Sequence, residues 1–277
     1  MRIKLCYMLA LSFIFCGTVN AKYYEYKIRK VDYKNLVANL YLPKTTGKVP
    51  VVIAIGGSEG GISTGDSNGE MIAPHGVAVL GLAYFKEKGI PETLDHIPLE
   101  YFKDAIDFLE TIHKIDSSRI GFVGGSRGAE LALLLASKEP RIKSVVATTP
   151  SSVAWYGRTT AQSAWTLNGK DIPALSLELD DNSPLLRRFE VALENKVNVK
   201  KALFSFEKIN GPILLISAEK DQIWPSYQMS KDILLYLKEH NFKYSVEHNS
   251  YATGHGFSGE TAPAIKKSII DHFVRTL

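Results

Sequence analysis

Short apolar runs, each closed by glycine or polar residues, recur along the chain and predict the strands of a buried sheet. These runs lie at 50–55, 77–84, 119–123, 143–148 and 212–217. They are almost uniformly apolar, as expected for strands that are covered on both faces. Apolar residues recur with a helical period between and after them, at 99–113, 129–138 and 226–240. Strands that alternate with helices predict a mostly parallel central sheet with helices on both faces.

The two ends of the predicted sheet have patterns of their own. Tyrosine-rich alternation at 23–31 and again at 36–42, with a polar turn between, predicts an antiparallel hairpin at a sheet edge. The segment 242–248 predicts the last strand, 251–257 a loop, and 262–273 a closing helix. These assignments organise the chain after residue 21 into one domain, 22–277.

One long segment interrupts the alternation. Between the strands at 143–148 and 212–217 the sequence is rich in tryptophan, proline and polar residues, with a short helical pattern at 185–193. A long insertion between sheet strands often forms a lid or a pocket wall. We therefore predict a lid-like insertion at about 151–206, with a surface elaboration as the alternative.

The first 21 residues predict a secretory signal peptide. Arg2 and Lys4 give a positive start, 5–15 is apolar but too short to span a bilayer, and small residues at positions 19 and 21 suit cleavage after Ala21. An uncleaved anchor and a lipoprotein modified at Cys16 are the alternatives. Cleavage would leave a secreted or periplasmic protein without a stable membrane anchor. It would also remove both cysteines, Cys6 and Cys16.

Composition and charge exclude several classes of protein. The hydrophobic content of 45% and the charged content of 22% are typical of a globular domain. The formal net charge of +4 falls to +2 when Arg2 and Lys4 are removed, and no basic stripe argues for a nucleic-acid partner. No motif indicates a metal or a cofactor. A small-molecule ligand is the partner that the sequence predicts.

The most informative motif lies between a predicted strand and a predicted helix. It reads G-x-S-x-G, with Gly124, Ser126 and Gly128. A serine on a sharp strand-to-helix turn needs small neighbours on either side, because the turn is tight. The backbone N–H of Arg127 would then open the helix and face the position where negative charge develops. The motif predicts a serine nucleophile, with a plain glycine turn as the alternative.

A serine nucleophile needs a base and an orienting carboxylate. His255 lies in a glycine-flanked loop between the last predicted strand and the last helix. Asp221 follows the 212–217 strand, at a strand end where ligand sites gather. Glu219 is its nearest rival, and Asp180 and Asp181 fit less well. The chain order Ser126, Asp221, His255 is that of the α/β-hydrolase fold.

The glycine-rich loop 56–61, after the 50–55 strand, is a candidate oxyanion hole. Its backbone N–H groups, at Gly57 or Ser58, would complement that of Arg127. A phosphate-binding loop fits less well, because the Lys-Ser/Thr ending of a P-loop and the spacing of a dinucleotide motif are both missing. A simple turn is the remaining alternative.

Several motifs together resemble the catalytic domain of the acyl-CoA thioesterases and bile acid-CoA:amino acid N-acyltransferases. They are the glycine loop at 51–61, the runs 82–85, 90–94 and 99–102, the nucleophile motif at 124–131, and Thr253-Gly254-His255. The resemblance extends from about residue 49 to the C-terminus and implies acyl-transfer chemistry. Family members with a serine nucleophile hydrolyse their substrate, whereas the amino-acid transferases use cysteine. Ser126 therefore favours hydrolysis of an ester or thioester, with an acyltransferase or a non-catalytic binding protein as alternatives.

Overall fold

The computed structural model describes residues 23–159, 162–177 and 182–277. The predicted signal peptide, Met1 to Ala21, with its two cysteines, lies outside the described residues. So do Asp180 and Asp181, the weaker candidates for the orienting carboxylate. Within the described residues, no helix is long and apolar enough to cross a membrane.

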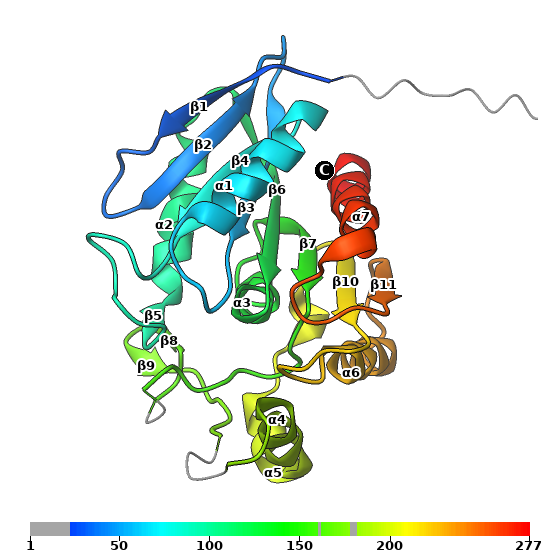
Figure 1. Cartoon of the computed structure of the whole chain (residues 1–277). Coiled ribbons are helices and arrows are strands. Elements are labelled where there is room, and N and C mark those ends of the chain that lie inside the picture. Colours follow the sequence, from blue (N-terminus) through cyan, green and yellow to red (C-terminus); the bar gives the residue numbers. More distant parts are fainter. Residues whose placement is uncertain (1–22, 160–161, 178–181) are drawn as a thin grey trace, which may run out of the picture.

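A twisted sheet of eight strands forms the centre of the described part of the chain (Figure 1). Its order is β1-β2-β4-β3-β6-β7-β10-β11, and all neighbours from β4 to β11 are parallel. The antiparallel hairpin lies at one edge, as the tyrosine-rich alternation predicted. The strands are β1 Tyr26–Lys30, β2 Val37–Pro43, β3 Val49–Ile55, β4 Ala78–Ala83, β6 Ile115–Gly125, β7 Ile142–Thr148, β10 Ile213–Ala218 and β11 Val246–Tyr251.

Helices cover both faces of the sheet, so the predicted fold class is confirmed. On one face, apolar side chains of α1 (Ser63–Ile72) and α7 (Ala262–Thr276) pack against the strands. On the other face, α2 (Leu99–Glu110), α3 (Arg127–Ala136) and α6 (Ser226–Glu239) form the larger apolar core with the opposite side of the same strands. Where the inner strands are buried on both faces, their sequence is almost uniformly apolar.

Helix α1 has almost no apolar periodicity and was not predicted from the sequence. It packs through glycines instead. A Cβ added at Gly65 would lie 2.9 Å from the Cα of Gly81, and one at Gly69 would lie 2.4 Å from the ring of Tyr41. Glycine weakens a helix, but here it allows the helix backbone to approach the sheet closely. A search for hydrophobic periodicity cannot find a helix of this kind.

The last strand begins later than predicted. Its predicted range was 242–248, whereas β11 pairs with β10 only from Val246 onward. The N–H of Phe242 donates to the carbonyl of Leu237, so this residue continues the turn that closes α6. The strand therefore runs to Tyr251, and the loop that carries His255 begins after it.

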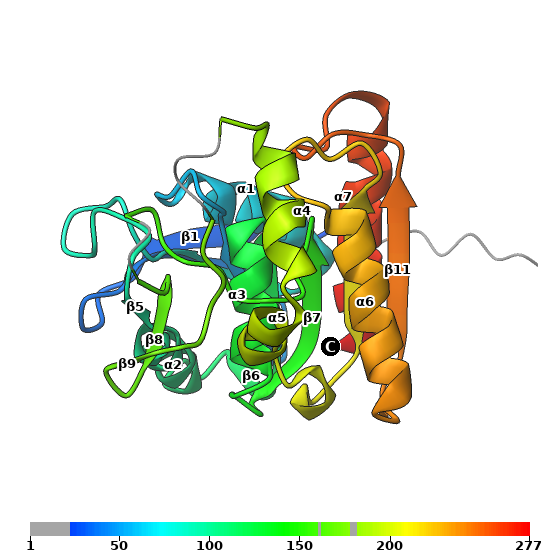
Figure 2. The ribbon, with the colours of Figure 1, turned by 90° about the horizontal axis from the view of Figure 1, so that it is seen from below.

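The segment between β7 and β10 holds smaller elements. These are β8 (Trp165–Leu167), β9 (Lys170–Asp171), α4 (Leu185–Glu194) and α5 (Lys196–Ala202), and β8 also pairs with β5 (Ile97–Pro98). Helices α4 and α5 lie beyond the lower end of the sheet in Figure 1, and in front of it when seen from that end in Figure 2. A separate apolar cluster joins this segment to the start of α6.

One buried histidine predicts how stability responds to acid. His272 on α7 is 2% exposed, and burial together with Arg275 lowers its pKa from 6.5 to about 4. The folded state therefore favours the neutral ring, whereas the unfolded chain takes up a proton below about pH 6.5. The contribution of His272 to the free energy of unfolding is fully present above about pH 6.5 and is lost as the pH falls toward 4.

We expect His272→Gln to flatten this part of the stability profile. The wild-type free energy of unfolding should fall by up to about 3 kcal/mol between pH 6.5 and 4 on account of this residue, since each unit of pKa shift corresponds to about 1.4 kcal/mol. Urea unfolding at a series of pH values measures the slope for both proteins. An equally steep profile in the variant would assign the acid sensitivity to other groups.

Candidate active site

Ser126 occupies a strained turn between β6 and α3. Its φ of 55° and ψ of −120° are unusual for a residue with a side chain. The turn is closely packed: a Cβ added at Gly124 would lie 2.1 Å from the carbonyl oxygen of Gly128, and one at Gly128 would lie 2.2 Å from that of Gly56. The glycines of the motif are therefore required by sterics, as the sequence predicted.

The structure brings Ser126, His255 and Asp221 together. The Oγ of Ser126 lies 2.9 Å from Nε2 of His255, and Nδ1 of the same ring lies 2.9 Å from both carboxylate oxygens of Asp221. The serine follows β6, the aspartate follows β10, and the histidine follows β11. Parallel strands end at the same edge of a sheet, which explains how residues far apart in sequence meet.

Asp221 is held by donors other than the histidine. Its side chain is 2% exposed, Oδ1 accepts from the N–H groups of Ile223 and Trp224, and Oδ2 accepts from the hydroxyl of Ser226 at 2.6 Å. These contacts fix the carboxylate in one orientation. A buried carboxylate with this many donors can hold the Nδ1–H tautomer of His255, which leaves Nε2 free to accept a proton from Ser126.

Glu219, the nearest rival for the orienting carboxylate, and His248, a second histidine at the end of the predicted strand 242–248, lie in other environments. Glu219 is exposed and accepts a hydrogen bond from the hydroxyl of Ser250. His248, on β11, lies 2.7 Å from the hydroxyl of Ser217 on the neighbouring strand. Neither residue contacts Ser126. The geometry therefore favours Asp221 and His255 over these two.

The two N–H groups predicted as oxyanion donors in the loop after β3 differ in their partners. The N–H of Gly57 donates to Oε1 of Glu59 at 2.9 Å, so in this conformation it already has an acceptor and is the weaker candidate. In the described part of the chain, neither Ser58 nor Arg127 donates its N–H to a protein acceptor. Ser58 lines the cavity beside Ser126, and Arg127 opens α3. These two N–H groups are the remaining candidates.

A buried tyrosine, Tyr84, contacts the glycine-rich loop through its hydroxyl. The hydroxyl of Tyr84 lies within hydrogen-bonding distance of the carbonyl oxygens of Gly56 and Gly57. Burial raises the pKa of this phenol well above its usual value, so it stays a protonated donor. The loop carbonyls are thereby held toward Tyr84, away from the site. Sequence reasoning missed this contact, because a tyrosine in an apolar strand is usually part of the core.

A cavity of about 400 Å³ opens beside Ser126. Its walls are mainly apolar and come largely from the insertion, but they also include Leu94, Ile223 and Trp224, which the sequence did not single out. Among the described residues, the charged side chains that line it are those of Arg127, Arg158 and Arg188. The apolar lining residues are Leu94, Trp155, Leu175, Leu177, Leu185, Phe189, Ile223 and Trp224. The cavity could hold an apolar acyl chain with its carbonyl at Ser126.

A buried ion pair lies in the first turn of α3, directly after Ser126 in the chain. Arg127 Nη1 lies 2.9 Å from Oε2 of Glu130, whose side chain is 0% exposed. Burial raises the pKa of Glu130 to about 7, although Arg127 and two N–H donors act in the opposite direction. The spacing of the pair along one helix turn was visible in the sequence, but nothing there indicated that Glu130 is buried.

The described residues contain no group of three or more histidine, cysteine, aspartate or glutamate side chains that could hold a metal ion.

Comparison with solved structures shows the fold. The chain superposes on a puromycin-hydrolysing peptidase of Mycobacterium tuberculosis with a TM-score of 0.65 and 15% identity, covering 93% of this chain and 40% of that one. It superposes on an acylaminoacyl peptidase of Pyrococcus horikoshii with a TM-score of 0.60 and 16% identity, covering 92% and 42%. Both are α/β-hydrolases. At these identities the likeness shows the fold alone.

Comparison with curated proteins is closer in sequence. Mouse acyl-coenzyme A amino acid N-acyltransferase 2 is 34% identical over 209 residues, which cover 73% of this chain and 47% of the relative. Human acyl-coenzyme A thioesterase 6 is 32% identical over 196 residues, covering 68% and 44%. The chain thus spans about half the length of the curated relatives that it matches. Residues 97–272 match the family described as BAAT / Acyl-CoA thioester hydrolase C terminal. The resemblance seen in the sequence is confirmed, and the chain belongs to this family.

Proposed function

We propose that the protein is a serine hydrolase that cleaves an ester or an acyl thioester through a covalent acyl-enzyme intermediate. The observation that carries the proposal is the hydrogen-bonded series from Ser126 Oγ through His255 to the buried carboxylate of Asp221. A serine hydroxyl is a weak nucleophile unless a base accepts its proton, and here a base lies within 2.9 Å.

The first half of the proposed reaction forms the acyl-enzyme. Ser126 Oγ attacks the carbonyl carbon while its proton passes to Nε2 of His255, and Asp221 stabilises the resulting imidazolium. The N–H groups of Arg127 and Ser58 stabilise the oxyanion, and a single such donor is typically worth about 10²–10³ in rate. The intermediate then collapses, and the leaving alcohol or thiol departs with the proton from His255.

The second half releases the acyl group. His255 takes a proton from water, whose oxygen attacks the acyl-enzyme carbonyl, and returns that proton to Ser126 as the acid leaves. Hydrolysis is favoured over transfer to an amine because the nucleophile is serine, whose oxyester reacts readily with water. Transfer to an amine or alcohol acceptor is the second candidate, since the mouse relative described above is named as an N-acyltransferase.

The substrate class follows from the cavity and from the relatives. The apolar walls beside Ser126 suit the hydrocarbon part of an acyl chain. The thioesterase relatives are named for acyl-coenzyme A, and we propose an acyl thioester or a related ester for this chain on that basis. We also propose that the protein is exported after cleavage behind Ala21, for which N-terminal sequencing of the mature protein should give Lys22 as its first residue.

A panel of substrates tests the proposed activity. The mature protein should hydrolyse p-nitrophenyl esters and acyl thioesters of graded chain length, and should release the free acid even when glycine or taurine is added. Mass spectrometry of the products distinguishes the acid from an N-acyl conjugate. A conjugate as the main product would assign the protein to the acyltransferases. No turnover of any ester or thioester would argue against the hydrolase altogether.

A further inference from the structure

The helix that follows the nucleophile carries a charge pair that the proposed chemistry does not use. Arg127 and Glu130 face the same side of the first turn of α3, and the N–H of Glu130 donates to the carbonyl oxygen of Ser126. Both side chains are buried, at 8% and 0% exposed. The pair is therefore part of the same turn that presents the nucleophile.

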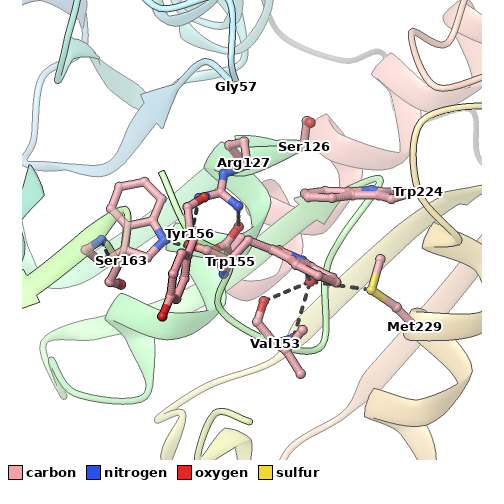
Figure 3. A network of polar contacts seen from close by, with 12 residues as sticks. Gly57, Ser126, Arg127, Val153, Trp155, Tyr156, Ser163, Trp224 and Met229 are labelled. Atoms are coloured by element: carbon pink, nitrogen blue, oxygen red, sulfur yellow. Dashed lines mark hydrogen bonds and ion pairs between the residues drawn. The ribbon is translucent and has the colours of Figure 1, made fainter. Parts of the chain in front are cut away.

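Both members of the pair hold the segment that forms one wall of the cavity. Oε1 of Glu130 accepts from the backbone N–H of Trp155 at 2.9 Å and from the indole N–H of Trp165 at 2.6 Å. The guanidinium of Arg127 donates to the carbonyl oxygens of Trp155 and Tyr156, both at 3.1 Å. Figure 3 shows Arg127 between Ser126 and this segment. Trp155 and Tyr156 themselves line the cavity.

From this wall, a series of aromatic contacts leads back to the catalytic base. The ring of Trp155 packs edge-on against Phe189, with ring centres 4.6 Å apart, and Phe189 packs in the same way against Trp224 at 5.6 Å. Trp224 in turn packs against His255 at 5.8 Å. All three aromatic residues line the cavity. A displacement of Trp155 would therefore change the packing of Phe189 and Trp224 as well.

A buried charge pair is an expensive way to join two segments, since apolar side chains of similar size often give equal or greater stability. What the two side chains add is direction, because Oε1 of Glu130 accepts from two N–H groups and the guanidinium of Arg127 donates to two carbonyl oxygens of the insertion. We propose that Glu130 is a positioning residue that fixes the Trp155–Tyr156 wall against the nucleophile turn and so sets the acyl-chain selectivity of the site. This inference rests on the proposed hydrolase function.

The test compares two matched variants in the mature protein. Glu130→Gln keeps the size of the side chain and one acceptor oxygen but removes the charge that faces Arg127. Glu139→Gln is the control, because Glu139 is also buried and also binds an arginine, Arg141, through both carboxylate oxygens. It lies in the turn beyond the far end of α3 and does not line the cavity. The substrates are p-nitrophenyl acetate and p-nitrophenyl octanoate.

We expect both variants to lose thermal stability, but only Glu130→Gln to change selectivity. Its kcat/KM for the octanoate should fall by about 10- to 100-fold, the size of effect expected when a positioned group moves by about 1 Å. The acetate, which does not reach the wall, should lose less than about threefold. Much of the loss on the octanoate should be in KM. An octanoate-to-acetate ratio within about twofold of wild type, as for Glu139→Gln, would show a merely structural role and overturn the inference.

Two further measurements keep the result interpretable. If Glu130→Gln does not fold, Trp165→Phe replaces it, because this change removes the indole donor to Oε1 and keeps the Glu130 carboxylate and an aromatic ring in place. It should lower the same ratio by a smaller factor. An unchanged ratio there would also overturn the inference. Labelling of the wild-type protein by a fluorophosphonate distinguishes a failure of the positioning role from a failure of the hydrolase proposal. If the wild type is labelled and the variants keep its selectivity, only the positioning role is refuted. If the wild type is not labelled, the hydrolase proposal itself is refuted.

Discussion

Replacement of Ser126 by alanine should lower kcat/KM for p-nitrophenyl esters by about 10⁵- to 10⁶-fold, the loss typical of removing the nucleophile of a catalytic triad. The fold should survive. The left-handed backbone of Ser126, with φ of 55°, is as strained for serine as for alanine, and the change removes one hydroxyl whose partner is His255. Circular dichroism and thermal unfolding should therefore match the wild type, while progress curves for ester hydrolysis become almost flat.

Ser58→Ala is the matched control for that experiment. Ser58 is an exposed serine that lines the same cavity, and the role proposed for it involves its backbone N–H, which alanine retains. We expect its kcat/KM to stay within about tenfold of wild type, far from the loss expected for the nucleophile. A comparable collapse in both variants would mean that the side chain of Ser58 takes part in the chemistry. Nearly full activity in Ser126→Ala would mean that the nucleophile has been misassigned.

Asp221→Asn should produce the second largest effect, a loss of up to about 10⁴ in kcat. The amide has nearly the shape of the carboxylate. Its oxygen can still accept from the N–H groups of Ile223 and Trp224, and its NH₂ group can donate to the hydroxyl oxygen of Ser226, so the loop should keep its structure. It cannot stabilise the imidazolium of His255 by charge, and its N–H₂ group favours the tautomer with the proton on the wrong nitrogen. Stopped-flow or steady-state kinetics on an activated ester measures the loss.

Glu219→Gln is the control for this variant, because Glu219 lies two positions earlier in the same loop. Its carboxylate contacts Ser250 at the surface rather than His255, so we expect less than about a twofold change in kcat. If Glu219→Gln were the crippling change and Asp221→Asn the mild one, the acid of the site would have been assigned incorrectly. That result would leave the assignment of Ser126 as the nucleophile unaffected.

The central sheet was predictable from the sequence, because its inner strands share one physical environment. A strand buried on both faces must be apolar at nearly every position, so the inner strands were recognisable from the sequence. Once these strands are taken as parallel, their carboxyl ends lie at one edge, and polar residues just after them are expected to meet. Ser126, Asp221 and His255 follow β6, β10 and β11, and the structure brings them together.

Features that depend on how individual glycines and side chains pack were not predictable. Helix α1 is recognisable only once Gly65 and Gly69 are seen against the sheet. The N–H of Gly57 was assigned to the oxyanion hole, but it is taken up by Glu59, a side-chain contact that spacing alone does not reveal. Nothing in the sequence indicates that Glu130 is buried, yet its partners include two tryptophans from the insertion.

Mass spectrometry of the acylated or phosphonylated protein tests the central claim most directly. The mature wild-type protein is mixed with a fluorophosphonate, the intact mass is measured, and the adduct is located by peptide mapping. We predict one adduct per chain, on Ser126, with none formed in Ser126→Ala and much slower labelling in His255→Ala. An adduct on any other residue, or an unmodified wild-type protein under conditions that label a known serine hydrolase, would contradict the account.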